Sequence, residues 1–162
     1  MAVALAAAIF VAVQRGAGAP SDAPTVGDSQ TAQVVRVVDG DTIVVRIGGR
    51  EERVRYIGVD TPESVKPDTP VQCFAERASA FNAKLVEGKA VRLDQDVDAR
   101  DRYGRLLAYV RAGGVFVNAE LVRRGYARPL TVPPNVRYAD RFARLASQAR
   151  ERGTGLWSAC SS

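Results

Sequence analysis

The sequence predicts a β-rich α+β domain in which five short strands form a small Greek-key barrel and three helices are attached to it. Two features support this prediction. Short β-branched runs alternate with glycine-containing turns, and apolar residues recur at helical spacing in one segment between these runs and in two segments after them. The chain has 162 residues, of which 46% are hydrophobic and 25% are charged, so it can form one domain with a sizeable core.

The strand positions follow from the turns between the β-branched runs. Gly48-Gly49 and Gly113-Gly114 are hairpin signals, and Asp39-Gly40-Asp41 joins the first two runs. We expect strands at residues 34–38, 42–47, 52–59 and 90–93, and a last hairpin formed by residues 106–111 and 115–117.

The helices are expected at residues 75–86, at residues 118–124 before Gly125, and in a last segment that Asn135 can cap. One helix among the strands and two after them indicate a five-stranded OB-type Greek-key barrel with three helices. Residues 156–157 should pack back on the core. The last helix is expected to present one apolar face, formed by Tyr138, Phe142, Leu145 and Ala149.

The N-terminal region differs from the rest in composition. Residues 2–13 form an apolar run without a charge, shorter than the ~20 residues that span a bilayer. We expect residues 1–15 to be a signal peptide or a membrane anchor, residues 16–32 a flexible linker and residues 33–160 the folded domain. The protein would then be secreted or extracytoplasmic, with anchoring at the cell surface as a variant. The alternative is a disordered or weakly helical tail.

Charge and histidine content restrict the possible functions. The formal net charge is +5, which favours a polyanion such as nucleic acid as partner. The chain contains no histidine, so a Ser-His-Asp or Cys-His nucleophile is excluded. Acid–base chemistry must therefore depend on carboxylates, lysine, tyrosine or a metal-bound water.

Charged residues gather at the predicted strand ends. Asp41 and Asp60 could bind a hard cation such as calcium together with the carbonyl of Thr61. Arg55 and Arg105 offer planar guanidinium groups that match phosphate oxygens. Taken singly, each aspartate can equally be a turn former and each arginine a solvated surface residue. Together they suggest phosphate chemistry assisted by a cation.

Five segments, in this order and spacing, closely resemble the staphylococcal nuclease-like thermonucleases, and the resemblance extends from about residue 34 to residue 157. They are Asp39-Gly40-Asp41-Thr42, residues 55–63 with Val59-Asp60-Thr61-Pro62-Glu63, Asp101-Arg102-Tyr103-Gly104-Arg105, Asn118-Ala119-Glu120-Leu121-Val122 and Gly155-Leu156-Trp157.

This resemblance implies an OB barrel with three helices and calcium-dependent hydrolysis of DNA and RNA to 3′-phosphorylated products. By the same resemblance, Asp41, Asp60 and the carbonyl of Thr61 bind calcium, and Arg55 and Arg105 bind the scissile phosphate. We expect a monomer with no obligate protein partner, and a preference for single-stranded or denatured nucleic acid.

The resemblance also assigns Glu63 as the general base, although a metal-bound water could deliver hydroxide instead. Arg102 and Tyr103 are expected to contact substrate. The sequence departs from the best-known member where two tyrosines flank the base pocket, because Thr131 and Pro133 stand there. Loss of aromatic stacking, worth ~1–3 kcal/mol per base, would affect ground-state affinity and base preference.

Two cysteines can pair. Cys73 and Cys160 are compatible with one disulfide in an exported domain, and two unpaired thiols are the alternative.

Two other functions are possible for such a basic barrel. One is a catalytically silent barrel that only binds nucleic acid, and the other is an anchored surface protein that binds acidic envelope polymers.

Overall fold

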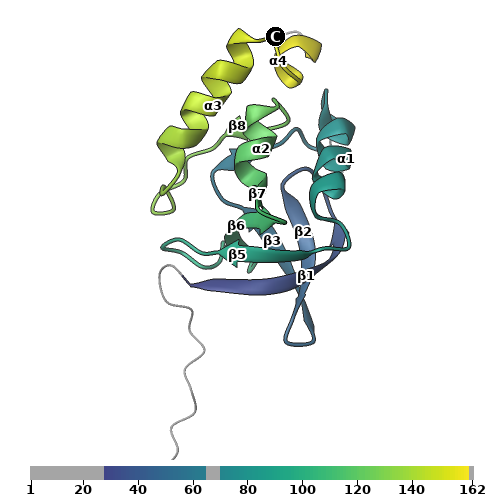
Figure 1. The fold of residues 1–162 in the computed structure, drawn as a ribbon, viewed down its shortest axis with the longest axis vertical. Coiled ribbons are helices and arrows are strands. Elements are labelled where there is room, and N and C mark those ends of the chain that lie inside the picture. The colour runs from purple at the N-terminus through teal and green to yellow at the C-terminus, as the bar shows by residue number, and fades with distance from the viewer. Residues whose placement is uncertain (1–27, 65–69, 161–162) are drawn as a thin grey trace, which may run out of the picture.

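The computed structural model describes residues 28–64 and 70–160, and it contains one sheet that closes into a barrel (Figure 1). The sheet has six strands in the order β3-β2-β1-β5-β6-β7, and a parallel pairing of β3 with β6 closes it. The five-stranded OB-type barrel is therefore confirmed, with β7 as an additional strand. Its strands are β1 Ser29–Val37, β2 Thr42–Ile47, β3 Arg50–Tyr56, β5 Ala90–Asp94, β6 Leu106–Ala112 and β7 Val115–Phe116.

The predicted boundary between linker and domain is wrong by four residues, because β1 begins at Ser29 rather than near Gln33. Residues 29–33 pair with β5, and the Ser29 hydroxyl donates a hydrogen bond to Asp94 over 2.9 Å. This pairing depends on backbone hydrogen bonds and on small side chains such as the buried Ala32, which a search for large apolar residues overlooks. The predicted signal or anchor segment, and residues 16–27 of the predicted linker, lie outside the described residues.

The predicted strand 52–59 is divided into two parts. β3 ends at Tyr56, and β4 (Val59–Asp60) turns away to pair with β8 (Arg128–Pro129) in a small second sheet. Gly58 makes this break possible through its positive φ of 79°. The turn carries Asp60 out of the barrel wall, to the place where the functional residues gather.

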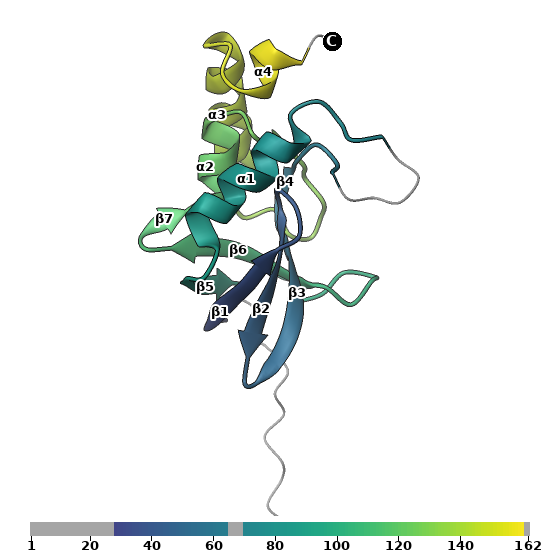
Figure 2. The same cartoon turned by 90° about the vertical axis from the view of Figure 1, so that its right-hand side faces the viewer.

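Four helices lie together on one side of the barrel, as two perpendicular views show (Figures 1 and 2). They are α1 Ala75–Val86, α2 Val117–Arg123, α3 Ala139–Glu151 and the short α4 Leu156–Ala159. Three helices were predicted; α4 was not, although Leu156 is buried and Trp157 packs against the core as expected. None of the helices in the described part of the chain is long and apolar enough to span a membrane.

Asn135 does not cap α3, contrary to the prediction, because this helix starts only at Ala139. Its buried side chain instead bonds the backbone of Asp98, accepting from the N–H over 2.8 Å and donating to the carbonyl over 2.9 Å. Asn135 therefore ties the segment before α3 to the loop that follows β5. The predicted apolar face is confirmed: Phe142 and Ala149 are buried, and Tyr138 and Leu145 are partly buried and pack against the core.

Cys73 and Cys160 are joined by a disulfide with an S–S distance of 2.07 Å, as the sequence suggested. The bridge connects the segment before α1 with the end of α4, across a sequence separation of 87 residues. It therefore fixes the C-terminal helix relative to the loop that begins at the β4 end of the barrel.

We expect Gly58→Ala to destabilise the fold more than Gly49→Ala, the matched control. Both glycines have similar φ values, 79° and 82°, so both variants lose about 1–2 kcal/mol to left-handed backbone strain. A Cβ atom at Gly58 would also lie 2.6 Å from a ring carbon of Phe142, whereas Gly49 faces open space. Such overpacking costs about 1–3 kcal/mol more. Urea denaturation of both variants measures the difference, and equal losses would contradict the proposed contact.

Candidate active site

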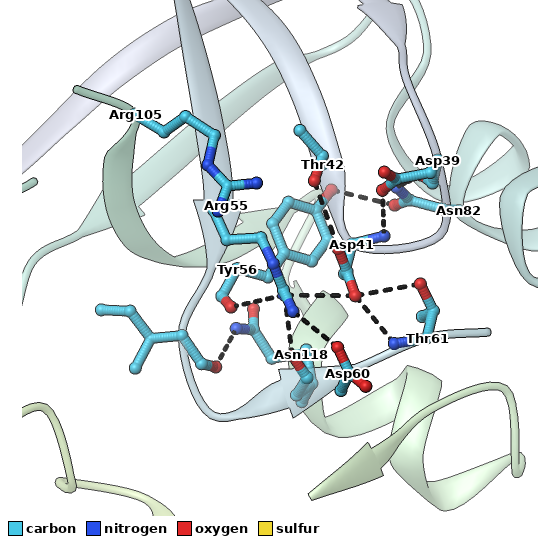
Figure 3. Close-up of polar contacts among 12 residues, drawn as sticks. Asp39, Asp41, Thr42, Arg55, Tyr56, Asp60, Thr61, Asn82, Arg105 and Asn118 are labelled. Atoms are coloured by element: carbon cyan, nitrogen blue, oxygen red, sulfur yellow. Dashed lines mark hydrogen bonds and ion pairs between the residues drawn. The ribbon is translucent and has the colours of Figure 1, made fainter. Parts of the chain in front are cut away.

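A pocket of about 80 Å³ collects most of the residues that the sequence singled out (Figure 3). It lies where the end of the β1–β2 turn, β3, β4 and the turn before β6 meet. Because β3 and β6 run parallel, with Arg55 opposite Leu107, the turn that carries Arg105 is brought next to Arg55. The pocket is lined by Asp39, Asp41, Thr42, Arg55, Asp60, Thr61, Pro62, Glu63 and Arg105.

Asp41 is the buried carboxylate of this pocket. Its Oδ2 atom accepts hydrogen bonds from the backbone N–H of Thr61 over 2.7 Å and from the Thr61 hydroxyl over 2.9 Å. Its Oδ1 atom accepts one from the Thr42 hydroxyl over 3.2 Å. These bonds join the β1–β2 turn to the residue that follows β4. Asp39 is a turn former, as expected, because its side chain accepts from the Asp41 N–H over 3.0 Å.

Burial raises the pKa of Asp41 to about 6, although the Arg55 guanidinium and the hydrogen bonds from Thr61 act in the opposite direction. The fold therefore keeps this carboxylate at an energetic cost, because desolvation disfavours its charged form. A group held at such a cost in a concave site is a candidate for function rather than for stability.

Arg55 links both aspartates, as Figure 3 shows. Its Nη1 atom lies 3.1 Å from Asp41 Oδ2, and its Nη2 atom lies 2.9 Å from Asp60 Oδ1. Nη1 also donates to the carbonyls of Tyr56 and Val59, over 3.1 and 2.7 Å. The guanidinium group is thereby fixed inside the β3–β4 turn. It balances the charge of one buried and one exposed carboxylate.

Arg105 is held by Asp101 of the same turn. The Asp101 carboxylate accepts from Arg105 Nε over 2.7 Å and from the backbone N–H groups of Tyr103 and Arg105, over 2.9 and 3.0 Å. Burial alone would raise the pKa of Asp101, but these hydrogen bonds outweigh it, so the pKa lies below its usual range. The Asp101 carboxylate, whose charged form these hydrogen bonds favour, thus holds Arg105 at the pocket.

Arg102 and Tyr103 lie beside the pocket rather than in its lining. Tyr103 is 68% exposed, and the guanidinium carbons of Arg102 and Arg105 lie 4.8 and 5.5 Å from its ring centre. Arg102 also donates to the Tyr103 hydroxyl over 2.6 Å. An exposed aromatic ring between two cations is suited to contact with a sugar or a phosphate.

A larger pocket of about 420 Å³ adjoins the first and shares Arg55 and Arg105 with it. Arginines 100 and 102 contribute polar groups, whereas Leu130, Val132, Pro133 and Pro134 form an aliphatic wall. Pro133 lies in this wall as the sequence suggested, but Thr131 does not line the pocket.

Two buried asparagines position the site (Figure 3); sequence analysis assigned no role to Asn82, and it noted Asn118 only as part of a matching segment. Asn82 of α1 donates to the Asp39 carbonyl over 3.0 Å and accepts from the Tyr56 hydroxyl over 2.9 Å. Asn118 of α2 donates to the Ile57 carbonyl over 2.9 Å. Both are fully buried. The signal for Asn82 was a polar residue within a helix that otherwise packs on the barrel, and the signal for Asn118 was its place in a segment that carries the family resemblance.

The donor set fits a hard cation. The small pocket offers carboxylate, hydroxyl and backbone oxygens, and neither sulfur nor imidazole lines it. Within residues 28–64 and 70–160, no group of three histidine, cysteine, aspartate or glutamate residues could hold a metal ion. A cation bound by Asp41 and Asp60 would therefore also need water or phosphate oxygens as ligands, as calcium and magnesium accept.

Comparison with known proteins identifies the family of the chain. The family described as staphylococcal nuclease homologue matches residues 53–159. A thermonuclease of Staphylococcus hyicus is 44% identical over 131 residues, which are 81% of this chain and 78% of the relative. A thermonuclease of Staphylococcus intermedius is 40% identical over 157 residues, or 97% and 93%. The SPbeta prophage-derived endonuclease YokF of Bacillus subtilis (strain 168) is 43% identical over 125 residues, or 76% and 42%. The family match and these relatives show that this chain belongs to the staphylococcal nuclease family.

Proposed function

We propose that this protein is a calcium-dependent nuclease that hydrolyses phosphodiester bonds in DNA and RNA with little sequence specificity. The observation that carries the proposal is the convergence of Asp41, Asp60, Glu63, Arg55 and Arg105 on one small pocket. The names of the similar proteins, two thermonucleases and one endonuclease, support the same activity.

The two arginines would bind the scissile phosphate. Both line the small pocket and the larger one beside it, so a phosphate between the two pockets can receive hydrogen bonds from both guanidinium groups. Attack on phosphorus adds negative charge to the phosphate oxygens. Fixed cations stabilise this charge without reorganising during the reaction, which lowers the barrier.

Glu63 would act as the general base. Two observations support this role: Glu63 lines the small pocket, and the chain has no histidine that could act instead. In the proposed reaction, a water oxygen attacks phosphorus while Glu63 accepts a proton from that water. The bond between phosphorus and the 5′-oxygen breaks, and the product keeps a 3′-phosphate.

Asp41, Asp60 and the Thr61 carbonyl would hold calcium, which when bound supplies a positive charge beside the phosphate and can lower the pKa of a coordinated water. The larger pocket is of a size to receive the nucleoside next to the scissile bond. Its aliphatic wall carries no aromatic ring, and the exposed ring of Tyr103, which also lines the pocket, could stack on any base, so we propose weak discrimination among bases. Single-stranded or denatured nucleic acid suits it best, because an unpaired base can enter.

We further propose that the protein is a monomer that acts outside the cytoplasm. The disulfide between Cys73 and Cys160 supports an oxidising compartment.

We expect Glu63→Gln and Arg105→Ala each to lower kcat on denatured DNA by roughly 100-fold or more, because each removes one acid–base or charge-stabilising interaction. Arg144→Ala removes an exposed arginine on α3 and is the matched control, with unchanged kcat expected. Steady-state kinetics with the full chain measures all three. Near-wild-type turnover in both pocket variants would contradict the mechanism, and cleavage products with 5′-phosphates would contradict the bond assignment.

We expect Asp41→Asn to abolish activity but to stabilise the calcium-free protein at pH 8, by about 1–3 kcal/mol. The pKa of Asp41 is raised from 3.8 to about 6 by burial, so the folded state binds a proton more tightly than the unfolded state. Its contribution to stability is therefore present below pH 4 and is lost as pH rises to about 6. The amide side chain of the variant does not titrate, so the variant does not lose this contribution to stability as the pH rises.

Guanidinium denaturation in chelator from pH 4 to pH 8 checks this expectation. The difference between variant and wild type should grow between about pH 4 and pH 6 and then stay constant, following the pKa of Asp41. A difference that is independent of pH, or a variant that is less stable at pH 8, would show that ionised Asp41 carries no desolvation cost.

A further inference from the structure

We propose that Gln72 is a positioning residue that sets the location of Glu63, and that the Cys73–Cys160 disulfide holds Gln72 in place. The inference rests on the proposed role of Glu63 as general base. It concerns a part of the chain outside the pocket, since Gln72 does not line it. Gln72 therefore acts through Glu63 and does not touch the reacting atoms.

Two hydrogen bonds join Gln72 to the backbone of Glu63. The Gln72 N–H donates to the Glu63 carbonyl over 2.9 Å, and the Glu63 N–H donates to the Gln72 side-chain oxygen Oε1, also over 2.9 Å. These bonds engage the peptide groups on both sides of the Glu63 Cα atom. Both bonds restrain the direction in which the Glu63 side chain leaves the backbone, and both come from one residue, nine positions further along the chain.

The preceding residue restrains Glu63 from the other side. Pro62 lines the pocket, and its ring fixes its own φ angle. Thr61, before it, is bonded to the buried Asp41. Glu63 is thus held between a segment attached to Asp41 and a segment attached to Gln72.

Gln72 is itself anchored by its neighbours in sequence. Its carbonyl accepts from the N–H of Ala75, the first residue of α1, over 3.1 Å. Cys73 is covalently bonded to Cys160 at the end of α4. The Phe74 ring lies 5.3 Å from the ring of Tyr126. Gln72 is exposed, so these attachments, rather than burial, keep it in position.

The functional consequence follows from the geometry of proton transfer. A general base must lie within hydrogen-bond reach of the attacking water, and a displacement of about 1 Å can lower the rate by roughly 100-fold. Loosening the Gln72 contact should therefore reduce kcat, because the carboxylate spends less time in position. It should leave KM nearly unchanged, because Arg55 and Arg105, which are proposed to bind the phosphate, are held by other residues.

The test is a double-mutant cycle between Gln72→Ala and Glu63→Gln, measured as kcat on denatured DNA with the full chain. Gln72→Ala removes the side-chain acceptor but keeps the backbone bond, so we expect kcat to fall roughly 10-fold in the wild-type background. In the Glu63→Gln background we expect less than a twofold further effect, because no base remains to be positioned. Gln72→Glu keeps an acceptor oxygen and should retain most of the wild-type kcat.

The matched control is Gln148→Ala, which removes an exposed glutamine on α3 and should leave kcat unchanged. The variant Cys73→Ser/Cys160→Ser tests whether the disulfide holds Gln72 in place. Assayed well below its melting temperature, it should lose kcat with Glu63 present and lose little more in the Glu63→Gln background.

The outcomes separate this inference from the proposed function. Wild-type kcat in Glu63→Gln would overturn the proposed catalytic role and this inference with it. A large loss in Glu63→Gln with wild-type kcat in Gln72→Ala would overturn the inference alone. Equal losses from Gln72→Ala in both backgrounds would show that Gln72 acts on another group, which also overturns it. Full kcat in the cysteine variant would refute the role of the disulfide.

Discussion

The ion pair between Arg55 and Asp41 is the contact on which the rest of the site depends. Both side chains are largely removed from water, at 14% and 6% exposure, and the Arg55 charge offsets part of the desolvation cost of ionised Asp41. The pair is possible because β2 and β3 are antiparallel with Thr42 opposite Arg55, which places Asp41 beside the Arg55 side chain. Arg55 also bonds the carbonyls of Tyr56 and Val59. One guanidinium group thereby joins the β1–β2 turn to the β3–β4 turn.

The barrel and the helices supply the remaining geometry. Closure between β3 and β6 brings the Asp101–Arg105 turn to the same place, and the buried amides of Asn82 and Asn118 fix backbone carbonyls on either side. The site thus stands at the ends of strands, where side chains can be exposed without opening the core. Its most buried carboxylate is retained at a cost in stability, because burial raises the pKa of Asp41 to about 6. Such a cost is expected where a charge serves binding or catalysis.

Local patterns in the sequence predicted the barrel, the positions of most strands and the cluster of charged residues at their ends, because turn formers and β-branched runs act over short distances. What the sequence did not show depends on contacts between distant residues. Ser29 joins β1 only because β5 pairs with it, and the chain breaks at Gly58 where Phe142 of α3 approaches. Asn135 has the sequence position of a helix cap but bonds Asp98 instead. Gln72 is an ordinary exposed residue until its contact with Glu63 is seen.

The most direct test of this account is the initial rate of hydrolysis of denatured DNA as free calcium is varied from chelator to saturation. We expect no cleavage in chelator and a rate that rises and saturates with calcium, because the bound ion would supply a positive charge beside the phosphate and lower the pKa of a coordinated water. An equal rate in chelator would contradict the assignment of the pocket to calcium. Tight binding of DNA without cleavage at any calcium concentration would identify a barrel that binds nucleic acid but does not hydrolyse it.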